Sequence, residues 1–138
     1  MRRLTNTLIF ALMAGTCFAQ AKPFASWLIS PGETKSAAVE VWPETSGEKQ
    51  SFWRLVSSSG TILAEMKQPM VPSGYTLNYG ECKVSGVLRY DTIAIVRHSS
   101  QKEWSSDLRG VWIPDENAKS FVKAQSKLVK CRNESYGV

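Results

Sequence analysis

The sequence predicts an all-β protein, built as a small antiparallel sandwich or barrel of about six to eight strands with one disulfide. Three observations predict this class. Short segments of alternating or β-branched apolar residues recur along the chain, Gly, Pro and Ser clusters separate them, and no clear crossover helix joins two of them. One short C-terminal helix is an open alternative to the last strands.

The first 21 residues are typical of a secretory signal peptide. Arg2 and Arg3 precede an apolar run from Leu8 to Phe18, and residues 19–21 form a small-x-small cleavage site. The run is shorter than the roughly 20 residues that a spanning helix needs, and no later run approaches that length. We therefore expect residues 22–138 to form a single all-β domain that is periplasmic or secreted and has no membrane span.

The net charge of the chain limits the class of partner that we expect, and its cysteine content indicates the redox state of its compartment. Two of the 17 basic residues lie in the leader, so the rest of the chain is only mildly basic against 12 acidic residues. Nucleic-acid binders usually carry a denser basic stripe, so we expect no nucleic-acid partner. Outside the leader two cysteines remain, Cys82 and Cys131, and in an oxidising compartment such a pair predicts a disulfide. It would stabilise the fold by about 4 kcal/mol.

The elements before the central strand follow from alternation and turn residues. Residues 26–30 predict a short edge strand, and residues 37–42 alternate cleanly as a second strand. Residues 52–56 and 61–66 flank a Ser/Gly stretch and predict a β-hairpin. Residues 68–80, with two prolines, two glycines and two tyrosines, predict a long connection.

The run from Val87 to His98 is the predicted central strand, because it is β-branched and apolar on both faces in its later half. A polar turn over residues 98–103 and a strand over residues 108–113, bulged at Gly110, follow. Residues 115–130 are ambiguous, since helical spacing competes with two short strands at 120–124 and 128–131. The tryptophans inside predicted strands should lie mainly in the core: Trp42, Trp53 and Trp112.

The candidate contact residues are aromatic or small and polar. Residues 72–80 combine Tyr with Ser, Gly and Asn, a composition that loop-borne binding surfaces use. We expect a partner to contact Ser73, Tyr75 and Tyr79, together with Trp104 in the polar turn. The tripeptide Ser73-Gly74-Tyr75 resembles, with a different spacing, the Ser-Gly-x-x-Tyr loop that small secreted lysozyme inhibitors present from an all-β, disulfide-bearing body. That resemblance implies a cell-wall hydrolase as the partner.

Catalytic chemistry has little support in the sequence. His98 is the only histidine, and the spacing of the acidic residues selects no pair as a general acid and base. We expect Arg89 and Asp91 to form a mutual or cross-strand ion pair on a solvated patch. The sequence contains no metal-ligand cluster, phosphate loop or dinucleotide motif, so we predict no catalytic, metal or cofactor residues.

The leading functional hypothesis is an exported, non-enzymatic protein-binding module. Its partner would be another envelope or secreted protein, and it would act as an inhibitor or immunity-type protein on a cell-envelope hydrolase. Two alternatives stay open. One is a small envelope hydrolase that uses His98 with a nearby carboxylate, and the other is a structural subunit of a surface assembly that exchanges a strand at a sheet edge.

Overall fold

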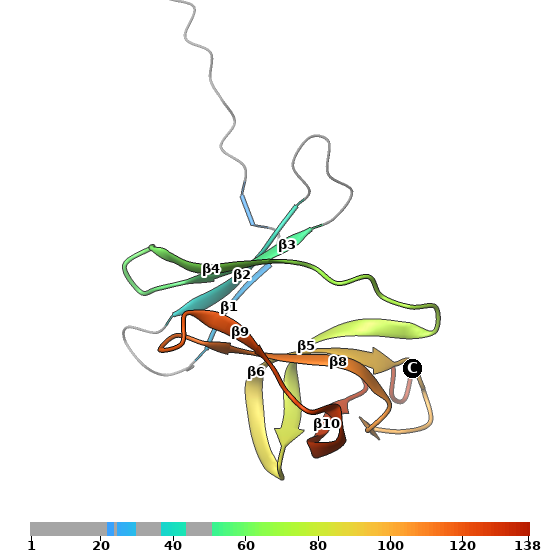
Figure 1. Cartoon of the computed structure of the whole chain (residues 1–138). Coiled ribbons are helices and arrows are strands. Elements are labelled where there is room, and N and C mark those ends of the chain that lie inside the picture. The colour runs from blue at the N-terminus through green and yellow to red at the C-terminus, as the bar shows by residue number, and fades with distance from the viewer. Residues whose placement is uncertain (1–21, 24, 30–36, 44–50) are drawn as a thin grey trace, which may run out of the picture.

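The computed structural model describes residues 22–23, 25–29, 37–43 and 51–138, so the predicted signal peptide lies outside the described residues. The strands form two antiparallel sheets in the orders β1-β2-β3-β4 and β7-β10-β5-β6-β8-β9, which pack face to face as a sandwich and do not close into a barrel (Figure 1). The elements are β1 Ala25–Leu28, β2 Ala38–Trp42, β3 Phe52–Val56, β4 Ile62–Lys67, β5 Tyr75–Val84, β6 Val87–Arg97, β7 Trp104–Ser105, β8 Leu108–Asp115, β9 Ser120–Lys123, the 3-10 helix η1 Ser126–Leu128 and β10 Val129–Arg132.

The predicted hairpin over residues 52–66 is confirmed as β3 and β4. Its turn is closed by the Gly60 amide, which donates to the Ser57 carbonyl at 2.9 Å, and by the Thr61 amide, which donates to Ser57 Oγ at 3.1 Å. Gly60 has a φ of 85°, a conformation that glycine adopts without steric cost. The predicted edge strand is also confirmed, since β1 lies at the edge of the four-stranded sheet.

β6 is the central strand that the sequence predicts. It lies between β5 and β8, and residues 91–96 are all buried. Alternate side chains of β6 enter two different cores, with Ile93 on one face and Ala94 and Val96 on the other. This placement explains why the run is apolar on both faces.

The core between the two sheets is centred on Trp53, which is fully buried. Its ring meets those of Tyr79, Trp112 and Phe121 at centroid distances of 6.4, 5.5 and 6.0 Å. The rings of Tyr79 and Trp112 are edge-on to Trp53, and that of Phe121 is tilted. All three belong to the six-stranded sheet, so Trp53 of β3 joins the two sheets. Trp42 and Trp112 are half-buried, so the predicted core position is complete only for Trp53.

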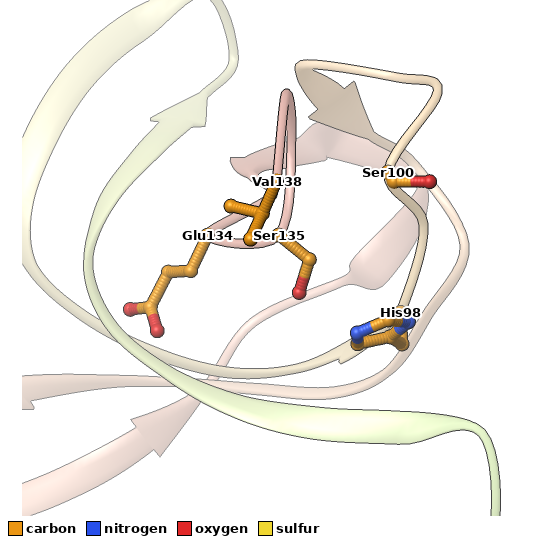
Figure 2. A pocket seen from close by; sticks show the side chains of 5 residues that line it. All are labelled: His98, Ser100, Glu134, Ser135 and Val138. Carbon is orange, nitrogen blue, oxygen red and sulfur yellow. The ribbon is translucent and has the colours of Figure 1, made fainter.

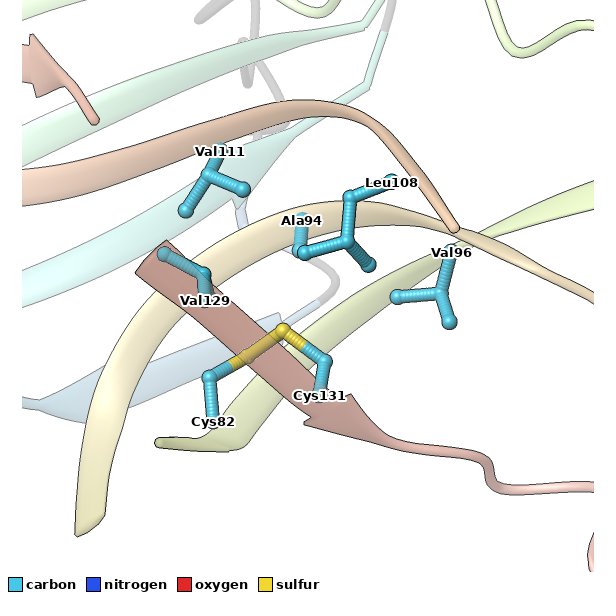
Figure 3. Close-up of a cluster of buried hydrophobic side chains, with 7 residues drawn as sticks. All are labelled: Cys82, Ala94, Val96, Leu108, Val111, Val129 and Cys131. Carbon is cyan, nitrogen blue, oxygen red and sulfur yellow. A yellow bond between two sulfur atoms is a disulfide. The ribbon is translucent and has the colours of Figure 1, made fainter. Parts of the chain in front are cut away.

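A second core lies on the other face of the six-stranded sheet, where the predicted Cys82–Cys131 disulfide is present (Figure 3). The two cysteines lie directly opposite one another on β5 and β10. Around them pack apolar side chains of β6, β8 and β10: Ala94, Val96, Leu108, Val111 and Val129. Side chains of β10 therefore pack on β6 and β8, and the disulfide links β10 covalently to β5.

Two bulges bend the six-stranded sheet. On β6, Tyr90 and Asp91 together oppose Glu81, because the pairing shifts between Gly80 and Cys82. On β8, Arg109 is the additional residue, since Ile95 pairs with Gly110 and Val96 with Leu108. The bulge that was predicted at Gly110 thus lies one position earlier, at Arg109, and such bulges increase the local twist and redirect side chains.

The structure corrects one predicted region and decides between the two alternatives for another. The connection after β4 is shorter than predicted, because β5 begins at Tyr75 and only residues 68–74 link the two sheets. Residues 115–130 contain β9 and η1 and lead into β10, so the strand alternative holds and the described chain has no α-helix. The pairing of Cys131 with Cys82 requires an extended segment there, which helical spacing alone could not reveal.

Candidate functional site

The turn that leads into β5 is fixed at both ends. The Tyr75 amide donates to the Pro72 carbonyl at 3.1 Å, and Gly74 takes a φ of 77°, as the third position of a type II turn requires. The Gly74 carbonyl accepts a hydrogen bond from the His98 amide at 2.9 Å, which ties the turn to the end of β6. Ser73, one of the predicted contact residues, is exposed at the tip of this turn.

Tyr75 is held by charged side chains, and we call the group of Tyr75, Arg97, Asp107 and Arg109 the Tyr75 cluster. The Tyr75 hydroxyl donates to Asp107 Oδ1 at 2.8 Å and accepts from Arg109 Nε at 2.9 Å. The guanidinium carbons of Arg97 and Arg109 lie 5.3 and 5.1 Å from the centroid of its ring. The bulge on β8 places Arg109 there, and Arg97 lies directly opposite Tyr75 on β6.

Two exposed apolar residues precede this turn, and the sequence analysis missed them. Met70 is 81% exposed and Val71 is 37% exposed, and both follow the β3–β4 hairpin in the chain. The signal was present in the sequence as an apolar pair between Pro69 and Pro72. Exposed apolar side chains grouped beside polar ones mark interaction surfaces more often than isolated ones do.

Tyr79 lies in the core, although the sequence groups it with Ser73 and Tyr75 as a contact residue. It is half-buried between the sheets, with its ring against Trp53, and its hydroxyl donates to Gln68 Oε1 at 3.3 Å. Burial raises the pKa of the Tyr79 phenol, and the Trp53 indole beside it partly opposes that shift. Its observed contacts are those of a core residue.

Trp104, the fourth predicted contact residue, belongs to a different surface. It is half-buried on β7, with the Lys83 ammonium 4.3 Å from its ring centroid. Lys83 lies near the end of β5, whereas Tyr75 begins that strand. The structure therefore brings Ser73 and Tyr75 together and places Tyr79 and Trp104 elsewhere.

His98 is exposed and lines a hollow of about 510 Å³ with Ser100, Glu134, Ser135 and Val138 (Figure 2). In Figure 2 the Glu134 carboxylate and the Ser100 hydroxyl point away from the imidazole. Of the carboxylates that the hydrolase alternative needs near His98, Asp107 is bonded to Tyr75. These orientations do not form a relay from a carboxylate through the imidazole to a hydroxyl.

Acidic residues elsewhere are engaged by arginines. Arg89 Nε and a second guanidinium nitrogen donate to the two carboxylate oxygens of Asp91 at 2.9 and 2.7 Å, so the predicted mutual ion pair is confirmed. Its predicted position on a solvated patch is wrong, because Asp91 is buried. The hydrogen bonds from Arg89 to Asp91 raise the pKa of Arg89. Arg132 binds Glu81 at 2.7 Å, and this contact raises the pKa of Arg132 in the same way.

Within the described residues, no group of three or more His, Cys, Asp or Glu side chains could hold a metal ion. The same part of the chain contains no helix long and apolar enough to cross a membrane. Compared with known proteins, the sequence and the structure match no family model, no curated protein and no solved structure significantly.

Proposed function

We propose that this chain is an exported, non-enzymatic module that binds another envelope or secreted protein. The contact surface is formed by the Tyr75 cluster, the turn with Ser73, and the exposed pair Met70 and Val71. The observation that best supports the proposal is the fixed turn before β5. It is hydrogen-bonded internally and to the residue that follows β6, while the apolar residues before it are exposed. The disulfide fits a protein that works in an oxidising compartment.

The rigidity of this surface supports protein binding. A surface that is ordered before it meets its partner loses less conformational freedom on binding, and more of the contact energy appears as affinity. Tyr75 is restrained by hydrogen bonds to Asp107 and Arg109, so its position is set in the free protein. Tyrosine and arginine are also the residue types that dominate binding hot spots.

The charge of the surface favours an acidic cleft as the partner. Arg97 and Arg109 are both exposed, and Asp107 is the only acidic member of the Tyr75 cluster. Glycoside hydrolases place two carboxyl groups in the cleft that holds the sugar. An arginine-flanked tyrosine is complementary to such a cleft, which agrees with an inhibitor of a cell-wall hydrolase.

The test is site-specific crosslinking in the native compartment. A photoreactive phenylalanine analogue replaces Met70 in one variant and Ile62, which is 50% exposed on β4, in the control. We expect one protein to be crosslinked at position 70 and not at position 62. The purified partner should then lose affinity for an Arg109→Glu variant and keep it for Lys119→Glu.

Failure has two forms. If both positions crosslink to the same mixture of proteins, or neither crosslinks, the proposed surface is wrong. The hydrolase alternative is favoured only by the exposed His98 beside Ser100 and Ser135. A purified protein that degrades cell wall, and loses that activity in His98→Ala, would replace the binding proposal.

A further inference from the structure

The strongest feature outside the proposed contact surface is a basic hollow at the far end of the β5–β6 hairpin. It has a volume of about 460 Å³ and is lined by Lys83, Gly86, Trp104, Lys127, Leu128 and Lys130. Half of these residues are lysines, and none of the described residues that line the hollow is acidic. We call this group the lysine hollow.

Two of the lysines face each other directly. Lys83 on β5 pairs with Lys130 on β10 in the antiparallel register, next to the Cys82–Cys131 pair. Like charges opposite each other destabilise a sheet, so this arrangement costs the fold free energy. Glu81, the nearest acidic residue along β5, is bound by Arg132. Within the part of the chain that the structure describes, no salt bridge engages Lys83, Lys127 or Lys130.

Exposed apolar side chains lie at the same end of the β5–β6 hairpin and on η1 beside it. Val87 is 66% exposed, Leu88 is 42% exposed and Leu128 is 51% exposed. Leu88 lies directly opposite Lys83, and the Ser85 amide donates to the Leu128 carbonyl at 2.8 Å. Figure 1 shows that the end of the β5–β6 hairpin projects beyond the sandwich, on the same side as β10. Apolar and cationic groups thus share one projecting end.

The residue types favour a lipid surface over a protein. Protein interfaces are enriched in arginine and depleted in lysine, whereas the described residues that line this hollow include three lysines and no arginine. Lysine side chains can lie along apolar surface and still present their ammonium groups to phosphates. Tryptophan, here beneath the Lys83 ammonium, is a residue that prefers the interface between hydrocarbon and water.

We propose that the lysine hollow and the hairpin end dock the protein peripherally on a membrane surface that displays anionic phospholipid headgroups. The three ammonium groups neutralise lipid phosphates, while Val87, Leu88 and Leu128 enter the headgroup region. Peripheral binding of this kind combines apolar burial with electrostatic attraction. It is separate from the proposed partner surface, which lies at the opposite end of β5.

The experiment measures partition of the disulfide-bonded protein onto vesicles by sedimentation. We expect binding to vesicles of phosphatidylcholine with phosphatidylglycerol, and none to phosphatidylcholine alone. Binding should weaken strongly as salt rises from about 0.1 M to 1 M, because the screening length falls from about 10 Å to 3 Å. Absence of binding to the anionic vesicles would overturn the proposal.

Matched variants separate this site from a general effect of net charge. K83Q/K130Q should lower the partition coefficient about 25-fold, since one lysine near an anionic surface contributes about fivefold. The control K22Q/K119Q removes the same charge from exposed lysines elsewhere and should change it much less. Leu128→Ser should weaken binding several-fold, and Ile62→Ser, an equally exposed apolar residue on β4, should not. Equal losses in test and control variants would contradict the proposal.

Two further outcomes would assign the hollow to another ligand. Inorganic phosphate that displaces the protein from vesicles better than chloride at equal ionic strength would indicate a site for a free anion. Binding to an acidic protein, with no binding to anionic vesicles, would indicate a protein interface. Each result would replace the lipid assignment without affecting the crosslinking test at position 70.

Discussion

The ring of Trp112 lies over Gly110, two residues earlier on the same face of β8. A Cβ atom on Gly110 would lie 2.4 Å from Cη2 and 2.8 Å from Cζ3 of that ring. Trp112 in turn meets Trp53 edge-on, with the ring centroids 5.5 Å apart. An aromatic ring that covers a strand glycine restores the packing that the missing side chain leaves open.

Gly110→Ala should therefore lower the free energy of unfolding by about 1–3 kcal/mol, the usual cost of overpacking a core. The measurement is urea denaturation followed by tryptophan fluorescence. If the clash with the ring is the cause, the same substitution should cost much less in a Trp112→Leu background. An equal cost in both backgrounds would show that the strand backbone, rather than the ring, excludes alanine.

Arg89 and Asp91 form an ion pair at the bulge on β6, on either side of Tyr90. The Asp91 side chain is 5% exposed and that of Arg89 is 39% exposed. Arg89→Gln should destabilise the protein by about 2 kcal/mol, because it leaves a buried carboxylate without its cation. The double variant R89Q/D91N should recover much of that loss. Additive costs of the two single variants in a double-mutant cycle would argue against the pairing.

The disulfide closes a loop with a sequence separation of 49 residues. The double variant C82A/C131A should be about 4 kcal/mol less stable than the oxidised protein, since its unfolded chain is less restricted. Reductant should destabilise the wild-type protein and leave the double variant unchanged. A wild-type denaturation curve that does not respond to reductant would contradict this prediction.

Lys130→Glu should raise stability by about 0.5 kcal/mol, because it replaces a repulsion with Lys83 by an attraction across the two strands. The gain should shrink as salt increases. Lys127→Glu makes the same charge change on η1, outside the paired register, and should give a smaller gain. The midpoint of urea unfolding at low and high salt distinguishes the two variants.

Tyr79 should make stability sensitive to alkaline pH. Burial raises the pKa of its phenol in the folded protein, so the fold retains the proton after the unfolded chain has lost it. Its contribution is complete below a pH of about 10, the ordinary pKa of tyrosine, and is lost as the pH rises through the folded pKa. The free energy of unfolding should fall more steeply above that pH in wild type than in Tyr79→Phe. Parallel pH curves would rule out this role.

Local patterns predicted the elements whose neighbours in space are close in sequence. Alternation and the Ser/Gly turn were enough for β3 and β4, and the β-branched run was enough for β6. The whole of β5 was missed. Residues 75–80 were assigned to the connection because Gly74 and Gly80 resemble loop residues, although Tyr75, Leu77 and Tyr79 alternate with polar or small residues, and residues 81–84 were assigned to no element. Its strand character depends on pairing with β6.

The candidate site depended still more on distant contacts. Tyr75 and Trp104 were both predicted as contact residues, and the structure gives them different charged partners. Tyr75 meets Arg109, which the bulge on β8 places beside it, and Trp104 meets Lys83 across β10. The spacing of these residues in the chain contains no information on either contact.

The disulfide lies next to the lysine pair and therefore affects how firmly the lysine hollow is held together. Lys83 and Lys130 repel each other across the same two strands that Cys82 and Cys131 join covalently. In a reduced molecule only backbone hydrogen bonds and packing would oppose that repulsion. Reduction would therefore remove the covalent link between the two strands that carry Lys83 and Lys130, and the cationic face would lose the constraint that keeps its two halves in register.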